Sequence, residues 1–113
     1  MVERAKIIAV DFDGTLIRGG FPNVENGEPN TRLFKKLIKA QTRGDKIILW
    51  TCRDGKLLQD ALAFCHRMGL VFDFVNENDP ENMEALGFDH EPRKVVADLY
   101  IDDLSVKPKW GDE

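Results

Sequence analysis

The sequence lacks the features of several specialised protein classes. Its longest apolar stretches are five or six residues, as in Ile47–Cys52, whereas a membrane-spanning helix needs about 20. Two cysteines, Cys52 and Cys65, are too few for a disulfide framework, and we expect both to be reduced. The formal charge of -4 lacks the excess of lysine and arginine on which general nucleic-acid binding depends. The N-terminus has no signal-peptide core, so we expect a cytoplasmic protein without membrane contact.

The remaining composition is that of an ordinary globular protein. The chain has 113 residues, of which 42% are hydrophobic and 32% are charged. That length suits one compact hydrophobic core and leaves no room for a second folded unit. We therefore expect residues 1–113 to form a single domain.

Short apolar runs alternate with segments of helical periodicity. Strands are expected over residues 7–10, 46–51, 71–75 and 100–101, and helices over residues 31–43 and 55–68 with a short one near 81–86. Glycine, proline and asparagine between residues 18 and 30 indicate an irregular loop or a small flap. The β-α-β-α-β alternation predicts an α/β fold in three layers, with a mostly parallel sheet between helices.

Polar clusters follow three of the predicted strands. They are Asp11–Thr15, Thr51–Asp54 and Asp102-Asp103. Ligands of parallel α/β sheets bind at the carboxyl ends of the strands. We therefore expect the three clusters to converge on one site.

Asp11 and Asp13 are separated by one residue, so in an extended segment their side chains share a face. These carboxylates, joined by that of Asp102, would repel each other unless one took up a proton or a cation lay among them. Mg²⁺ favours such oxygen ligands. The alternative is that Asp-x-Asp-Gly is only a turn after a strand.

The motifs DFDGT (residues 11–15), IILWT ending at Thr51 and YIDD ending at residue 103 resemble those of the haloacid-dehalogenase superfamily of phosphatases. The resemblance covers nearly the whole chain, in the expected order. It implies a three-layer α/β/α Rossmann-like sandwich. Neither position at which larger members insert a cap domain has room for one here, so a capless type is expected.

The resemblance also implies roles for individual residues. Asp11 would attack phosphorus and Asp13 would act as general acid and base, and the metal ligands would be Asp11, Asp13, Asp102 and Asp103. Whether Asp102 or Asp103 contacts Mg²⁺ directly stays open. The phosphate would be held by Thr51, Cys52, Arg53 and Lys94.

The cation that neutralises the phosphate is the least determined of these residues. Lys94 is the nearest match to the family pattern, and Arg93, Arg53 and Lys56 are its competitors. Eight extended residues would carry Lys94 about 26 Å from Asp102. The chain must therefore turn near Ala97 if Lys94 is to serve.

The expected function is Mg²⁺-dependent hydrolysis of a phosphomonoester through an aspartyl-phosphate. An open, capless site suggests a large phosphorylated substrate, or closure by another subunit such as a second copy of the chain. Phosphorylated nucleotides and oligonucleotides stay among the candidates. Two alternatives stay open: a receiver-like domain that accepts phosphate, and a catalytically idle module that binds metal or phosphate.

Overall fold

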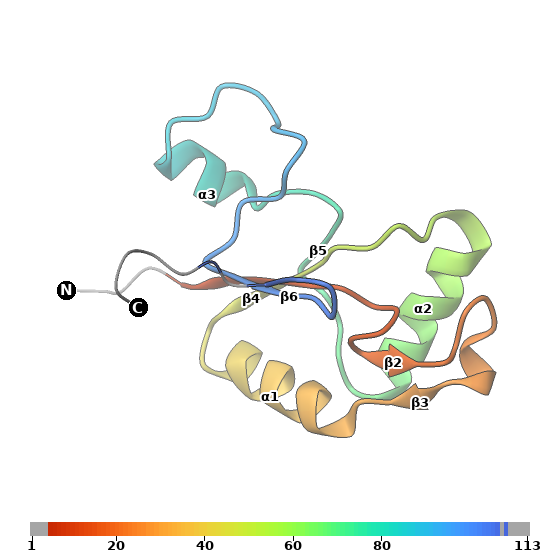
Figure 1. The fold of residues 1–113 in the computed structure, drawn as a ribbon. Helices are drawn as coiled ribbons and strands as arrows, with labels where there is room; N and C mark the ends of the chain where they lie inside the picture. The colour runs from red at the N-terminus through yellow and green to blue at the C-terminus, as the bar shows by residue number, and fades with distance from the viewer. Residues whose placement is uncertain (1–4, 107, 109–113) are drawn as a thin grey trace.

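A parallel sheet of four strands forms the centre of the structure, a computed structural model that describes residues 5–106 and 108 (Figure 1). The strands are β1 (Ile7–Val10), β4 (Lys46–Leu49), β5 (Phe74–Val75) and β6 (Leu99–Ile101). Their spatial order is β5-β4-β1-β6. The chain therefore leaves β1 towards one side of the sheet and later returns to its other side. In such sheets the reversal of strand order opens a crevice at the carboxyl ends.

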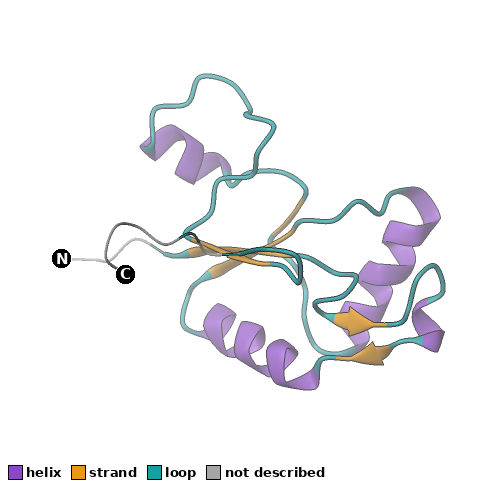
Figure 2. Cartoon of the chain, viewed as in Figure 1, coloured by secondary structure: helices purple, strands orange, loops and turns teal. Residues whose placement is uncertain are grey.

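Helices cover both faces of this sheet, as Figures 1 and 2 show. Helices α1 (Thr31–Thr42) and α2 (Gly55–Arg67) lie on one face, and α3 (Pro80–Ala85) lies on the other. The predicted three-layer α/β/α Rossmann-like fold is confirmed, and neither connection between the described elements carries an inserted cap domain. No helix in residues 5–106 has the length and apolar character needed to cross a membrane.

The segment expected to be a loop or a small flap is a second, two-stranded sheet. β2 (Ile17–Arg18) pairs antiparallel with β3 (Glu28–Pro29). The 3-10 helix η1 (Val24–Asn26) lies between them. Two-residue strands leave little periodicity in a sequence, which is why the pattern predicted no strand here.

Side chains of the central strands alternate between two cores. Ile8 and Val10 point into the larger core with α1 and α2, whereas Ile7 and Ala9 join a smaller cluster with Ile48 and Val95. The larger core includes buried Phe12, just after β1. The face of the sheet that α1 and α2 cover therefore carries the larger core, and the opposite face carries the smaller one.

The predicted element boundaries are largely confirmed. Asn30 caps α1 as expected, because its side chain accepts a hydrogen bond from the Leu33 amide at 3.1 Å. Asp54 stands at the N-cap of α2 but makes no capping hydrogen bond with its side chain. Strand β5 is shorter than predicted, because Val71 is 62% exposed and the Asp73 carboxylate instead accepts the Ile47 amide at 2.7 Å.

Candidate active site

Three carboxylates meet at the carboxyl edge of the sheet. They belong to Asp11, directly after β1, and to Asp102 and Asp103, directly after β6, and one oxygen of each lies within 4.8 Å of the others. The strand register produces this meeting, because Val10 pairs with Ile101 and the Asp11 amide donates to the Ile101 carbonyl at 2.9 Å. The predicted convergence of the first and last clusters is therefore present.

Local hydrogen bonds fix the acids that follow β6. The Asp103 amide donates to the Thr15 hydroxyl oxygen at 3.0 Å, and the Leu104 amide donates to the Asp102 carboxylate at 2.9 Å. Gly14 has a φ of +82°, and a Cβ there would overlap the Asp103 carboxylate. Glycine is thus required at position 14 both for its backbone conformation and for the close approach of Asp103.

The acidic group carries uncompensated negative charge. The pKa of Asp11 is raised to about 6, chiefly by burial and in addition by the charges of Asp102, Asp103 and Asp13, against an opposing hydrogen bond from the Phe12 backbone. No lysine or arginine among the described residues forms an ion pair with Asp11, Asp102 or Asp103. A cation that takes only oxygen ligands fits this donor set.

The spacing of the three oxygens also suits one small ion. A single ion can bond to three carboxylate oxygens only if the oxygens lie within a few ångströms of one another. Here all three lie within 4.8 Å of one another. Asp11, Asp102 and Asp103 are therefore the residues that would hold Mg²⁺.

The Asp13 carboxylate does not join this acidic group, contrary to the expectation that it is a fourth metal ligand. It accepts two hydrogen bonds from Arg53 instead, from Nε to Oδ2 and from Nη2 to Oδ1, both at 2.8 Å. The expectation assumed an extended chain through residue 13. In the structure β1 ends at Val10 and the Phe12 carbonyl accepts from the amides of Thr15, Leu16 and Ile17, so the chain turns after Phe12 and Asp13 does not follow an extended course.

The Arg53 side chain is buried, with 1% of it exposed, and it binds other groups of the protein instead of standing free for a phosphate. Besides the pair to Asp13, its guanidinium donates to the carbonyls of Gly20 (3.0 Å), Pro22 (3.2 Å) and Leu57 (3.2 Å). These bonds use all five N–H groups of an arginine. In this arrangement none is left for a phosphate, which corrects the assignment of Arg53 to phosphate binding.

Two aromatic rings complete the surroundings of Arg53. The guanidinium carbon lies 4.9 Å from the ring centre of Phe12 and 5.2 Å from that of Phe21. The residue therefore joins the loop after β1, the β2–β3 connection and the start of α2. The sequence shows an arginine two positions after Thr51. It does not show that hydrogen-bond acceptors from three separate segments lie around that arginine.

Thr51 follows β4 at the same edge of the sheet. Its hydroxyl oxygen accepts the Arg53 amide at 3.1 Å, so its own O–H remains available to donate. Asn76 braces the backbone of Thr51, because its Oδ1 accepts the Thr51 amide at 2.8 Å and its Nδ2 donates to the Thr51 carbonyl at 3.0 Å. The neighbouring Cys52 is exposed, with a free thiol.

Asn76 was not among the predicted site residues. It has a φ of +54°, a left-handed conformation that asparagine tolerates better than most residues. The signal in the sequence was an asparagine directly after the predicted third strand. Without the strand order, nothing connected it to Thr51.

The structure separates the candidate cations. Lys94 lies over the Tyr100 ring, 5.0 Å from its centre, and lines the same cleft as Asp102. The Tyr100 hydroxyl donates to the Val95 carbonyl at 2.6 Å, which holds the predicted turn between Lys94 and β6. Arg93 does not line this cleft, and Lys56 pairs with Asp60 along α2 at 3.2 Å. Lys94 is thus the candidate that the fold brings to the acidic edge.

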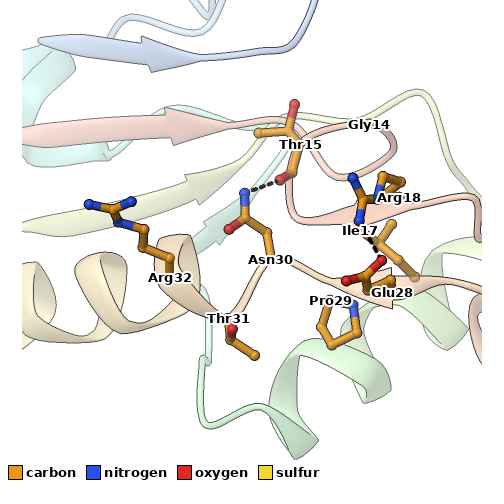
Figure 3. Close-up of a pocket in the computed structure, with 9 residues that line it drawn as sticks. All are labelled: Gly14, Thr15, Ile17, Arg18, Glu28, Pro29, Asn30, Thr31 and Arg32. Atoms are coloured by element: carbon orange, nitrogen blue, oxygen red, sulfur yellow. Dashed lines mark hydrogen bonds and ion pairs between the residues drawn. The ribbon is translucent and has the colours of Figure 1, made fainter.

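A pocket of about 440 Å³ is lined by the loop after β1 and by the segment from β3 to the start of α1 (Figure 3). Gly14 and Thr15 form one wall, and the Asn30 Nδ2 donates to the Thr15 carbonyl at 3.1 Å across it. Arg18 and Glu28 form an exposed ion pair at its edge. Asn30 thereby fixes the loop whose Thr15 hydroxyl holds Asp103.

Comparisons with known proteins give a structural match. No protein-family model matches the chain, and no curated protein matches it either. A solved structure does, described as that of the conserved protein coded by a locus from Bacteroides thetaiotaomicron. The two chains are 39% identical with a TM-score of 0.75, and the match covers 95% of this chain and 84% of the other.

Proposed function

This chain belongs to the same family as the conserved Bacteroides thetaiotaomicron protein, and we propose that it is a Mg²⁺-dependent phosphomonoesterase with Asp11 as nucleophile. The observation that carries the proposal is the meeting of Asp11, Asp102 and Asp103 at the crevice of the sheet, with Asp13 held separately by Arg53. The resemblance to the haloacid-dehalogenase superfamily supports the same reaction.

In the first step an Asp11 carboxylate oxygen attacks phosphorus. The new O–P bond forms as the bond between phosphorus and the ester oxygen breaks, and the departing oxygen takes a proton from Asp13. The Thr51 hydroxyl and the Lys94 ammonium group bind the phosphoryl oxygens. The products of this step are the free alcohol and an aspartyl-phosphate.

In the second step Asp13 removes a proton from water, and the water oxygen attacks phosphorus. The bond between Asp11 and phosphorus breaks, which releases inorganic phosphate and restores both carboxyl groups. Mg²⁺ held by Asp11, Asp102 and Asp103 would neutralise charge on the phosphoryl oxygens. Arg53 fixes the direction of Asp13, and the remaining lone pairs of that carboxylate stay free for the proton.

The test is release of inorganic phosphate from a panel of phosphomonoesters with Mg²⁺. We expect the parent to turn over at least one ester, Asp11→Asn to lose turnover and the matched surface change Asp60→Asn to keep it. Turnover by Asp11→Asn at the parent rate would show that the nucleophile is wrong. Mg²⁺ binding without turnover of any ester would instead favour the idle binding module.

A further inference from the structure

A cleft of about 830 Å³ opens on the face of the sheet that carries α3. Its lining includes Ala9, Trp50, Lys94, Tyr100 and Asp102. Asp102 also belongs to the acidic group of Asp11, Asp102 and Asp103, so the cleft meets the candidate active site at this residue. Its size lies in the range of about 300–1,000 Å³ that small-molecule sites occupy.

The strand register places Trp50 beside the nucleophile. Val10 pairs with Leu49 on one side and with Ile101 on the other. The next residues along the three strands are Asp11, Trp50 and Asp102, and the Trp50 amide continues the ladder by donating to the Val10 carbonyl at 2.8 Å. Residues at matching register positions point to the same face of a sheet. The indole therefore stands in one row with the two acids.

The indole of Trp50 is available for a ligand. The residue is 36% exposed, and the ring pairs found among the described residues involve only Phe12, Phe34 and Phe64. Across the cleft, Lys94 is held over Tyr100 and offers a positive charge. The cleft thus combines a free aromatic face with a cation, next to carboxylates suited to a metal ion.

The aromatic ring and the cation of the cleft indicate which leaving group the ester would carry. We propose that the cleft binds phosphomonoesters whose leaving group carries a nucleobase, with the base stacked on Trp50 and the phosphate between Asp11 and Lys94. This inference rests on the proposed function. Bases stack on aromatic side chains with little sequence preference. A free nucleotide and the phosphorylated end of a short oligonucleotide present the same chemistry, and the experiment separates them.

The experiment compares kcat/KM for a nucleoside monophosphate, a short 5′-phosphorylated oligonucleotide and glycerol phosphate, which has no ring. Stacking predicts that Trp50→Ala loses about tenfold to a hundredfold on at least one nucleobase substrate. Its activity on glycerol phosphate should stay within about twofold of the parent, and Trp50→Phe should keep most of the nucleotide activity because a ring remains. The matched control Phe88→Ala removes an exposed ring outside the cleft lining and should change none of the three.

Equal losses by Trp50→Ala on all three substrates, or no loss on any, would overturn the inference while leaving phosphatase activity in place. If the parent hydrolyses no ester, calorimetric titration of a nucleoside monophosphate into the Mg²⁺-loaded protein tests the cleft separately. Weaker binding to Trp50→Ala than to the parent supports the inference. Equal binding, or none to the parent, ends it. Urea midpoints of the variants show whether each is folded.

Discussion

Replacing Arg53 tests whether its hydrogen bonds stabilise the fold around the candidate active site. Its side chain is 1% exposed, and its five N–H groups bind Asp13 and the carbonyls of Gly20, Pro22 and Leu57. Arg53→Ala removes every one of these bonds and leaves the Asp13 carboxylate without its partner. Arg53→Lys keeps the charge but offers three donors in place of five.

The contacts of Arg53 set the loss in free energy of unfolding that we expect for each variant. Removing one partner of a buried ion pair costs about 3–5 kcal/mol, and the Asp13 side chain is 35% exposed and can regain water. We therefore take the low end, about 3 kcal/mol, for Arg53→Ala. Arg53→Lys loses at least two hydrogen bonds at about 1 kcal/mol each, hence about 2 kcal/mol.

Urea unfolding of both variants measures these free energies. The matched control is Arg18→Ala, whose ion pair with Glu28 has side chains 80% and 66% exposed and should contribute less than about 1 kcal/mol. If Arg53→Ala loses no more free energy of unfolding than Arg18→Ala, the proposed stabilising role of the Arg53 hydrogen bonds is wrong.

A second readout concerns Asp13 itself. If Arg53 directs Asp13 towards the leaving oxygen, Arg53→Lys should slow hydrolysis of alkyl phosphates, whose leaving groups need a proton. Hydrolysis of p-nitrophenyl phosphate should change much less, because its leaving group departs without one. General acid catalysis contributes about 10²-fold or more, so a misdirected Asp13 should cost at least about tenfold on the alkyl ester. Equal effects on both esters would indicate a purely structural role for Arg53.

Three further predictions concern the acidic group and the cysteines. The raised pKa of Asp11, about 6, means that its contribution to metal-free stability is complete below about pH 4 and is lost as the pH rises through 6. Asp11→Asn should therefore flatten the profile of melting temperature against pH, and an unchanged slope would contradict the shift. Mg²⁺ at 100 times its Kd should stabilise the parent by about 2.7 kcal/mol, and Asp102→Asn should reduce this gain in thermal melts. A thiol reagent should modify exposed Cys52 in the native protein. Cys65 is buried, and burial raises its pKa to about 12, so it should react only after unfolding. Fast reaction of both thiols in the native protein would contradict the packing of Cys65.

The sequence predicted the fold class and the meeting of the first and last acidic clusters. Both depend on patterns that survive in a single chain: apolar runs mark the strands, and the acids stand directly after them. The run Ile7–Val10 is predicted to the residue, because a strand covered on both faces is continuously apolar. In the structure the parallel register of β1 and β6 brings Asp11 next to Asp102.

The partners of individual side chains could not be predicted in this way. Arg53 meets the Gly20 and Pro22 carbonyls, 33 and 31 positions away along the chain, and Asn76 meets Thr51 from 25 positions away. Such contacts depend on the exact course of loops, for which an isolated sequence has no periodic signal. Lys94 is the intermediate case, because the sequence required a turn and the structure supplies it through Tyr100.

The separation of Asp11 from Asp13 shows how one local event divides two similar residues. An extended chain would have placed both carboxylates on one face. Strand β1 instead ends at Val10, and the Phe12 side chain is fully buried in the larger core. The Phe12 carbonyl accepts three amides, so the chain turns between the two acids. Asp11 then faces carboxylates and Asp13 faces a guanidinium. Two acids need different surroundings to serve as nucleophile and as proton carrier. The packing of Phe12 therefore gives Asp11 and Asp13 the difference in surroundings that the proposed mechanism requires within three residues.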